Sequence, residues 1–261
     1  MKYYVTDSRM ALVIGNSYIG EGCELPGTKR DAEEVKRKLE KCDFSVSLHF
    51  NLRKKELEDT FNAFVSKLKS KDHAIFYFSG HGLSYQGEQL LVPCKMEQPE
   101  KEYQIRYKTF SCEHVVHELA RYTTNGCKII ITDCCRSEYW HVLKGIGSRN
   151  GFEFNNVSIE FDPNNANNDA KNKGYSDVET RNIVRMCAAS SGQAAEAGLG
   201  SSLSYYTRAL LNHILIPNLS IMELNIKICS DLEERDAKPE ICFTAPGDIV
   251  NDFRFKKSED V

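Results

Sequence analysis

Two short polar segments of this chain contain residues suited to nucleophilic chemistry. The first is Gly80-His81-Gly82 and the second is Asp133-Cys134-Cys135-Arg136. A cysteine attacks as its thiolate, and a neighbouring histidine can take the thiol proton or stabilise the thiolate. The backbone N–H groups of Gly82 and Cys135 could together stabilise an oxyanion. We therefore treat His81 and Cys135 as a candidate catalytic pair, with Gly82 and Cys135 as candidate oxyanion donors.

Both segments directly follow predicted strands. Residues 74–78 form a short apolar run that leads into His81, and residues 127–132 lead into Cys135 in the same way. The remaining predicted elements are strands at 11–14, 44–48 and 183–188, helices at 29–41, 52–69, 112–122, 202–215 and 220–234, and a hairpin across 83–93 turning at Gln86-Gly87. Ser220 and Glu223 have the spacing of a capping box at the start of the last helix.

Strands and helices alternate along the chain. This order predicts an α/β fold, with helices on both sides of a mostly parallel central sheet. The carboxyl ends of parallel strands lie at one edge of a sheet, which is where ligands bind in such folds. The topology would therefore bring His81 and Cys135 to the same edge, although they are far apart in the sequence.

Composition excludes several classes of protein. The chain has 261 residues, 41% of them hydrophobic, which is enough for a core and argues against disorder. A net charge of −3 is too small to predict binding to nucleic acid or to an anionic membrane. No apolar run approaches the ~18 residues of a membrane span, and no signal peptide is visible. Ten cysteines without regular pairing favour a reduced, cytoplasmic setting.

The two polar segments resemble the motifs of the caspase-like cysteine peptidases, which comprise caspases, metacaspases and paracaspases. Six ordered blocks between residues 11 and 215 carry the resemblance: Ala11–Asn16, Leu25–Ala32, Phe76–Gly82, Asp133–Arg136, Cys187–Glu196 and Ser204–Thr207. The resemblance implies a caspase-like three-layer α/β/α sandwich. It also implies a cysteine endopeptidase that acts on proteins or peptides, with His81 and Cys135 as its catalytic dyad.

The adjacent cysteines raise a question of register. The family pattern places one residue between the acid and the nucleophile and an arginine directly after the nucleophile, and Cys135 alone satisfies both conditions. Cys134, one residue earlier on an extended segment, is expected to point to the opposite face. A zinc site formed by Cys127, Cys134, Cys135 and His141 is a rival interpretation, but adjacent cysteines are not a usual zinc spacing.

Three carboxylates indicate the substrate class. In caspases the pocket for the residue before the scissile bond has basic and amide groups and selects Asp, whereas in paracaspases and metacaspases it has carboxylates and selects Arg or Lys. The similar positions here are Asp31, Asp133 and Glu196, and Leu25 stands roughly where a caspase has its Asp-binding Arg. Converging carboxylates suit a planar guanidinium better than an ammonium. We expect Arg to be preferred over Lys. Alternatively, Asp31 starts a helix, Asp133 caps a strand and Glu196 is surface charge.

No metal or other cofactor is expected. Metacaspases commonly bind calcium with an acidic cluster after the histidine motif, but the segment from Gly82 to Cys94 contains one acid, Glu88. Calcium requires several oxygen ligands. The resemblance therefore favours the paracaspase branch, and Arg136, in place of a metacaspase-type His, agrees with this.

We expect one peptidase domain over residues 1–261. It comprises a large-subunit-like part at 1–136, a polar, Asn-rich insertion at 137–182 and a small-subunit-like part at 183–261. The insertion stands where family members have their intersubunit linker, and it is either a site of self-cleavage or a plain surface loop. A homodimer through the strand at 241–244 is possible, because an apolar edge strand can pair with a second copy.

Two alternative functions stay open. The chain could be a caspase-fold interaction module with little turnover, although the presence of both dyad residues argues against this. An Asp-specific caspase is disfavoured by Leu25, Asp31 and Asp133, because these residues place no cation in the pocket.

Overall fold

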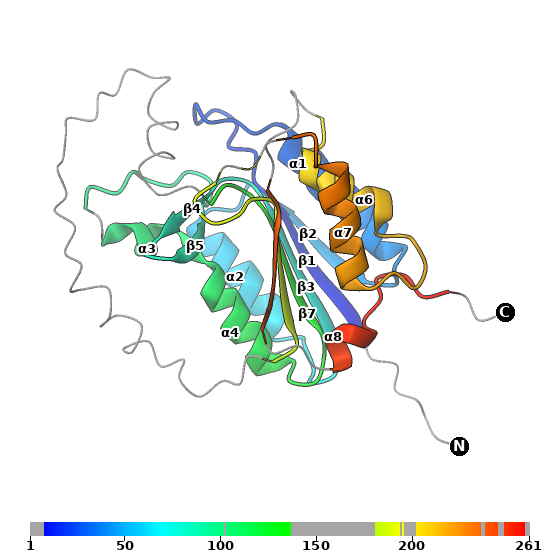
Figure 1. The fold of residues 1–261 in the computed structure, drawn as a ribbon. Coiled ribbons are helices and arrows are strands. Elements are labelled where there is room, and N and C mark those ends of the chain that lie inside the picture. The colour runs from blue at the N-terminus through cyan, green and yellow to red at the C-terminus, as the bar shows by residue number, and fades with distance from the viewer. Residues whose placement is uncertain are drawn as a thin grey trace.

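The computed structural model describes residues 8–101, 103–136, 181–193, 195, 202–235, 238–244 and 248–258. Its centre is a six-stranded sheet in the order β2-β1-β3-β7-β8-β9 (Figure 1). The strands are β1 (Arg9–Gly15), β2 (Ser45–Phe50), β3 (His73–Ser79), β7 (Lys128–Asp133), β8 (Ile183–Cys187) and β9 (Glu240–Thr244). The first five are mutually parallel, and β9 runs antiparallel to β8. The predicted mostly parallel sheet is confirmed.

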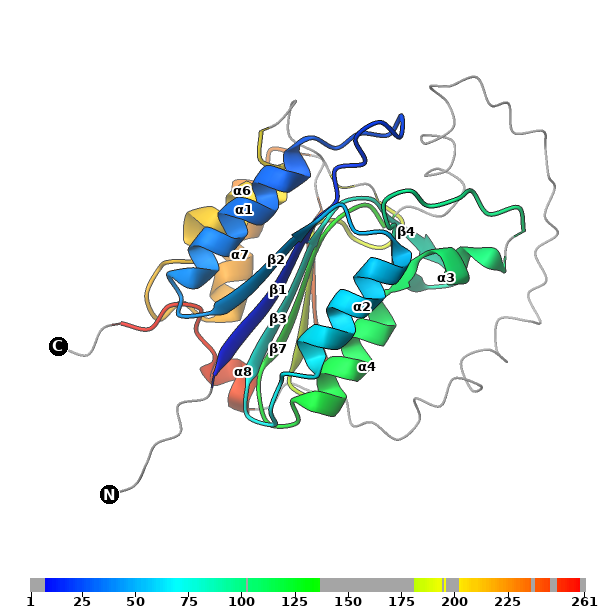
Figure 2. The same ribbon diagram turned by 180° about the vertical axis from the view of Figure 1, so that it is seen from behind.

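Helices cover both faces of this sheet (Figures 1 and 2). One face carries α1 (Gly27–Glu40), α6 (Tyr205–His213) and α7 (Ile221–Asp231), and the other carries α2 (Lys54–Val65) and α4 (Cys112–Tyr122). Alternate residues of each strand point to opposite faces. Val13, Ile75 and Ile129 accordingly join one hydrophobic cluster, and Leu12, Phe76 and Ile130 join the other. The result is the predicted α/β/α sandwich.

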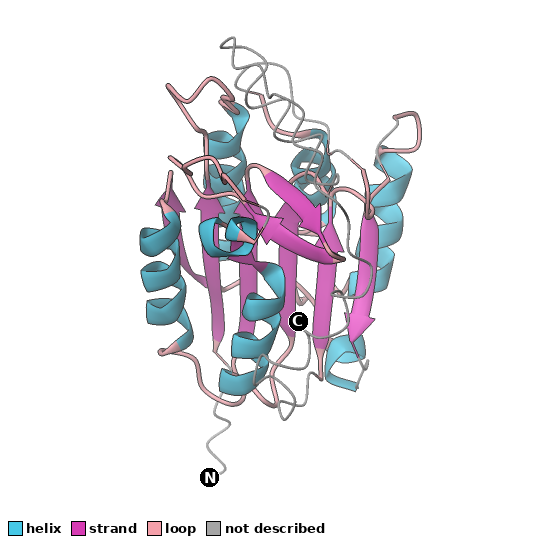
Figure 3. Ribbon diagram, turned by 90° about the vertical axis from the view of Figure 1, so that its left-hand side faces the viewer, coloured by secondary structure: helices cyan, strands magenta, loops and turns pink. Residues whose placement is uncertain are grey.

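A small second sheet crosses one end of the main sheet (Figure 3). It consists of β4 (Gly82–Tyr85), β5 (Glu88–Leu91) and β6 (Phe110–Ser111). The turn between β4 and β5 is made by Gln86 and Gly87, both with positive φ, 50° and 76°. This is the backbone of the turn type that matches strand twist in a two-residue hairpin, so the predicted hairpin and its pivot are confirmed.

The main differences from the sequence prediction concern element ends and short elements. Helix α2 ends at Val65 rather than near residue 69, and α1 begins at Gly27, two residues before the predicted start. The helix at 220–234 is observed as α7, and the Ser220–Glu223 capping box is present. Strand β6 and two short helices, α3 (Gln104–Lys108) and α8 (Asp248–Asp252), were not predicted. None exceeds five residues, too short for a hydrophobic period.

Strand pairing determines where the two polar segments leave the sheet. Strands β3 and β7 are neighbours, and their last residues, Ser79 and Asp133, lie opposite each other. The N–H of Gly80 then donates to the Asp133 carbonyl at 3.2 Å. His81 and Cys135 therefore leave adjacent strands at the same edge of the sheet.

Two expectations concern parts of the chain that are only partly described. Almost all of the predicted insertion, residues 137–180, lies outside the described residues, as does Glu196. Among the helices that the structure describes, none combines the length and the apolar character required to cross a membrane.

Candidate active site

Four of the predicted site residues line one cavity at the carboxyl edge of the sheet. Its volume is about 270 Å³, and Asp31, His81, Asp133 and Cys135 all contribute to its wall. The rest of the described lining comes from the loop between β1 and α1, the start of α1, the ends of β3 and β7, Cys134, Ala195, and Ser204 at the start of α6. Segments far apart in the sequence thus converge, as the parallel topology predicts.

His81 is held by a backbone carbonyl. Its Nε2 atom lies 2.7 Å from the carbonyl oxygen of Cys23, in the loop between β1 and α1. A carbonyl can only accept, so Nε2 carries the hydrogen and Nδ1 is the basic nitrogen of the neutral ring. Burial lowers the pKa of His81, against the opposing effect of the Cys23 carbonyl. A neutral imidazole with a free Nδ1 can act as a general base.

Tyr18 lies in the loop between β1 and α1 and also holds His81. It was not identified from the sequence as a site residue. Its hydroxyl donates to the Val92 carbonyl at 2.6 Å and accepts from the backbone N–H of His81 at 2.9 Å. The Tyr18 ring centroid lies 4.5 Å from that of His81. Tyr18 is 1% exposed, so it holds both the backbone and the ring of His81 from inside the protein.

Cys135 is half-buried and reduced. Its Sγ lies 3.9 Å from the carbonyl oxygen of Ala195. Burial raises the pKa of the Cys135 thiol, and the negative charge of Asp133 raises it further. Among the described residues, no hydrogen bond joins Cys135 to His81. Burial thus favours the neutral thiol and the neutral imidazole over a thiolate–imidazolium pair.

Cys134 has a different environment from its neighbour. It is 2% exposed and packs in the hydrophobic cluster beneath α2 and α4. A side chain at Gly82 would bring its Cβ within 2.5 Å of the Cys134 sulfur and 2.7 Å of the Cys135 carbonyl oxygen. Only glycine fits here, so Gly82 packs directly against the cysteine segment.

Asp31 and Asp133 form a buried acidic pair, although they come from α1 and β7. Ser204 bridges them: its backbone N–H donates to Asp31 Oδ1 at 2.9 Å, and its hydroxyl donates to Asp133 Oδ2. Ser79 Oγ donates to the second oxygen of Asp31 at 3.0 Å, and Thr207 Oγ1 donates to Asp133 at 2.6 Å. The two carboxylates are 1% and 6% exposed.

Burial and mutual repulsion disfavour two negative charges in this pair. Burial raises the pKa of Asp31 to about 7, and the charge of Asp133 adds to this effect. Burial also raises the pKa of Asp133, while hydrogen bonds from Ser204 and Thr207 oppose the shift. Among the described residues, no lysine or arginine forms a hydrogen bond or ion pair with either carboxylate. A site of this kind favours a bound cation.

Comparison with known proteins identifies the family. A family profile described as "Caspase domain" matches residues 8–249 of the chain. The protein belongs to the caspase domain family. Among curated protein sequences, none matches the chain.

Solved structures share the fold of this caspase domain. Caspase-1 from Spodoptera frugiperda superimposes with a TM-score of 0.63 at 12% identity, covering 97% of this chain and 93% of its own. Protein GSU0716 from Geobacter sulfurreducens has a TM-score of 0.62 at 16% identity, covering 97% of this chain and 100% of its own. At such identities the likeness concerns the fold, while the family assignment implies a cysteine peptidase acting on proteins.

Arg136 anchors the segment that follows the candidate nucleophile of the caspase domain. Its backbone N–H donates to the Gln193 carbonyl at 2.8 Å, and its carbonyl accepts from the Gly192 N–H at 2.9 Å. The guanidinium forms an ion pair with Glu240 at the start of β9. Arg136 therefore connects the loop of Cys135 to the edge strand β9, and its guanidinium has a structural role.

Two sequence expectations about metals can be located in the caspase domain. Glu88, the single acid after the histidine motif, accepts from Ser111 Oγ and pairs with Arg106 at 3.0 Å. Cys127 directly precedes β7, whereas Cys134 follows the other end of that strand. At ~3.3 Å per residue the six residues between them keep the two sulfurs too far apart for one zinc ion. His141 lies outside the described residues.

The residues that sequence reasoning missed are those that support the site from other elements. Ser204 enters the sequence analysis only as part of a block that resembles the family, and the Cys23 carbonyl has no signal of its own. Tyr18 has a positive φ of 54°, and Gly15, Gly20 and Gly22 surround it in the sequence. A buried tyrosine in a glycine-rich loop is the one local signal that could have indicated it.

Proposed function

We propose that this caspase-family protein is a cysteine endopeptidase that cleaves after a basic residue, with Arg preferred over Lys. The observation that carries the proposal is the buried Asp31–Asp133 pair, which lines the same cavity as His81 and Cys135. A substrate guanidinium would supply the direct cationic partner that the pair lacks among the described residues, where Arg208 acts on Asp31 through its charge without a hydrogen bond or ion pair. Two carboxylates on different elements can also receive its planar N–H groups in two directions. Glu196, outside the described residues, remains a proposed third acid.

The proposed reaction uses the dyad in the arrangement described above. His81 Nδ1 takes the proton of the Cys135 thiol as the sulfur attacks the carbonyl carbon of the scissile bond. The N–H groups of Gly82 and Cys135 stabilise the oxyanion. The C–N bond then breaks as His81 returns its proton to the leaving amine, and water, activated by His81, hydrolyses the thioester to regenerate the thiol.

The acidic pair would also link substrate binding to nucleophile activation. The charge of Asp133 opposes formation of the Cys135 thiolate. A bound basic side chain would offset that charge and would thereby lower the pKa of the thiol. The proposed substrate thus assists the deprotonation on which its own cleavage depends, whereas an acidic side chain would oppose it.

The proposed enzyme is paracaspase-like and calcium-independent. The Ser111 and Arg106 contacts of Glu88 support calcium independence, because they already engage its carboxylate oxygens. A homodimer through β9 is part of the proposal, since β9 is the last strand in the sheet order and, within the described part of the chain, β8 is its single neighbour. We further propose the domain organisation and the cytoplasmic location expected from the sequence.

A catalytically weak interaction module is the second candidate. The observation that favours it is the absence of a direct His81–Cys135 hydrogen bond among the described residues. Both candidates use the same fold, so turnover distinguishes them.

The test is cleavage of matched fluorogenic peptides ending in Arg, Lys or Asp, measured with calcium and with chelator at several protein concentrations. We expect Arg to be cleaved fastest, Lys more slowly and Asp not at all, with no effect of calcium. Specific activity should rise with protein concentration if the dimer is the active form. Cys135→Ala should abolish cleavage, and Cys94→Ala, at a buried thiol that packs in the same hydrophobic cluster as Tyr18, should not.

Each of the other possible outcomes would contradict a different part of the proposed function. Cleavage after Asp would overturn the role of the acidic pair while leaving the dyad intact. Activity that survives in Cys135→Ala would overturn the nucleophile. The absence of any turnover at high concentration would favour the interaction module.

A further inference from the structure

The two adjacent cysteines carry chemically equivalent thiols. Cys134 and Cys135 have the same side chain, and a change in the orientation of this short segment would exchange the thiol that faces the cavity. The thiols themselves do not decide between these orientations. Alternation along the extended segment places the two thiols on opposite sides, and contacts from outside the segment stabilise the orientation in which Cys134 lies in the interior.

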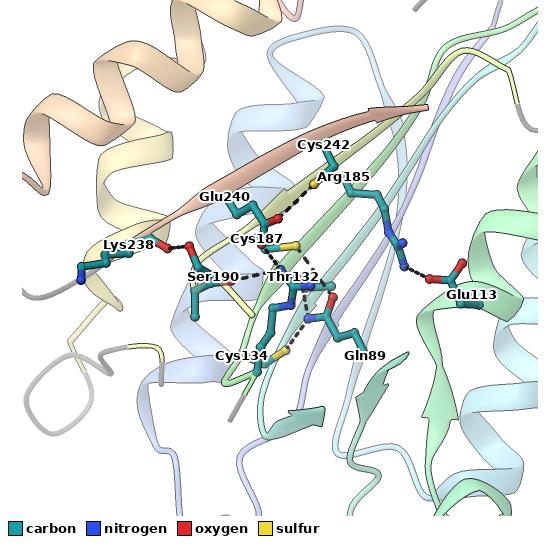
Figure 4. A network of polar contacts seen from close by, with 12 residues as sticks. Gln89, Glu113, Thr132, Cys134, Arg185, Cys187, Ser190, Lys238, Glu240 and Cys242 are labelled. Carbon is teal, nitrogen blue, oxygen red and sulfur yellow. Dashed lines mark hydrogen bonds and ion pairs between the residues drawn. The ribbon is translucent and has the colours of Figure 1, made fainter. Parts of the chain in front are cut away.

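Gln89, on β5, contacts the sulfur of Cys134 (Figure 4). Its Nε2 atom donates to Cys134 Sγ at 3.4 Å and to Thr132 Oγ1 at 3.0 Å, and its Oε1 accepts from Cys187 Sγ at 3.8 Å. A primary amide has two N–H donors and one carbonyl. Each of these groups is used, and Gln89 is 5% exposed. It is therefore a fully bonded polar group inside the protein.

Two of the three contacts fix the position of the amide. Thr132 and Cys187 lie opposite each other on the neighbouring strands β7 and β8. With its amide attached to both strands, Gln89 has little freedom to turn. The direction of its remaining N–H, toward Cys134, is consequently set by the main sheet.

Gly82 closes the other side of Cys134. The position of a Cβ at Gly82 lies 3.0 Å from the Cys134 Cβ and 2.5 Å from its sulfur. The backbone of Gly82 therefore already occupies the space beside this thiol. Cys134 is held between Gly82 and the Gln89 amide.

Both cysteines contribute to the cavity wall, and we propose that Gln89 is a positioning residue for the catalytic cysteine: it holds the Cys134 thiol in the interior so that the Cys135 thiol is the one presented to the substrate. The inference rests on the proposed catalytic role of Cys135. It adds a residue on a different sheet, well before the cysteine in the sequence, to the determinants of the active site.

The hairpin that carries Gln89 also carries the histidine. Strand β4 begins at Gly82, directly after His81, and β5 returns with Gln89 opposite Ser84. One hairpin thus presents His81 at its start and contacts the cysteine segment from its second strand.

The test replaces Gln89 by leucine, which keeps the side-chain volume and removes all three hydrogen bonds. The matched control is Gln104→Leu, on α3, where the glutamine side chain contacts the backbone of Glu100 and Lys101 instead. For each variant, the site of alkylation by iodoacetamide at pH 7 is mapped by mass spectrometry. Values of kcat and KM for an Arg peptide and the thermal midpoint are also measured.

In the wild type and in Gln104→Leu, we expect labelling at Cys135 and little at Cys134. In Gln89→Leu, label should appear on Cys134, and kcat should fall about tenfold with KM within about twofold, because a misplaced nucleophile slows the chemical step more than binding. If Gln89→Leu does not fold, Thr132→Val, which removes one anchor of the amide, should produce the same changes in smaller measure.

The inference is overturned if labelling in the folded variant stays confined to Cys135 at the wild-type rate, whatever happens to kcat. Failure of the proposed function looks different. In that case the wild type itself would show no Arg cleavage, or its label would fall on Cys134.

Discussion

The two ends of the main sheet both hold charged groups away from water, but in opposite ways. At the amino end of the strands, Arg9 begins β1 and Lys128 begins β7, and Lys128 is 1% exposed. At the carboxyl end, Asp31 and Asp133 are buried beside the cavity. The amino end therefore holds a half-buried and a buried cation, together with the buried Asp72 directly before β3, whereas the two buried carboxylates at the carboxyl end lie beside the cavity.

The cations at the amino end have partners within the protein. Arg9 Nη1 donates to the carbonyls of Cys42 and Phe255 at 2.7 Å each, and its guanidinium lies over the rings of Phe44 and Phe253 at 4.7 and 5.1 Å. Lys128 Nζ donates to the Thr123 carbonyl at 2.7 Å. Carbonyl oxygens and aromatic faces satisfy a cation without an opposing charge, and these contacts join the C-terminal segment to β1.

The anions at the carboxyl end receive hydroxyl and N–H donors, but among the described residues no cation forms a hydrogen bond or ion pair with them, and Arg208 acts on Asp31 only through its charge. They also face a cavity, whereas Arg9 and Lys128 are enclosed by their own partners. The comparison indicates that charge enclosed by partners holds a fold together, and charge left unbalanced beside a cavity prepares a binding site.

The largest expected effect comes from Asp31→Asn. The amide can still accept from Ser204 and reach Ser79, but it removes one charge from the pair. We expect kcat/KM for an Arg peptide to fall about 100-fold, as for loss of a buried charge partner. The pKa of Asp31, about 7, lies above its unfolded value, so the ionised group destabilises the fold above pH 7. The thermal midpoint at pH 8 should therefore rise.

The matched control for this change is Asp59→Asn, on the exposed side of α2, where the carboxylate pairs with Lys55. Asp59→Asn should leave kcat/KM for the Arg peptide and the thermal midpoint at pH 8 nearly unchanged. Loss of stability together with activity in Asp31→Asn would show that the pair has a purely structural role, and would break the comparison between the two ends.

The next effect concerns pH. The folded-state pKa of Asp31 of about 7 means that the acidic pair gains a proton as the pH falls through neutrality. A protonated pair attracts a guanidinium less, so KM for an Arg peptide should rise by up to about tenfold per pH unit below 7. The measurement is KM from pH 5.5 to 8.5 for the wild type and Asp31→Asn. A KM that is flat with pH in the wild type would contradict the assignment.

The smallest effect on cleavage is expected for Arg9→Met. This change removes the enclosed guanidinium and leaves its carbonyl partners without a donor, so the free energy of unfolding should fall by about 2–4 kcal/mol. Denaturant unfolding measures the loss, and the preference for Arg over Lys should not change. Arg37→Met, at an exposed arginine on α1, serves as the control. A changed preference would show that the two ends of the sheet are coupled.

Much of this architecture follows from local sequence patterns. Apolar runs such as 74–78 and 127–132 become buried parallel strands because both faces of the sheet are covered, and the amphipathic pattern of α4 is that of a helix packed on one side. The turn between β4 and β5 is likewise a local feature, because it depends on the two adjacent positive-φ residues Gln86 and Gly87. These features depend on neighbouring residues, which is why they can be derived without the fold.

The environment of each site residue could not be derived in this way. Ser204 bridges Asp31 and Asp133 across 173 and 71 positions of sequence separation. The Cys23 carbonyl selects the basic nitrogen of His81, and Gln89 reaches Cys134 from another sheet. Backbone carbonyls and buried amides leave no distinctive pattern in a sequence, so only the tertiary contacts identify them.

The sequence by itself determined the fold class, the edge of the sheet at which His81 and Cys135 meet, and the acidic residues near them. It did so because strand order and periodicity are local properties, and parallel strands present their carboxyl ends together. The tertiary structure decided the proton state of His81, the pairing of Asp31 with Asp133 and the opposite placement of Cys134 and Cys135. Those properties depend on burial and on partners from distant segments, and both exist only once the chain has folded.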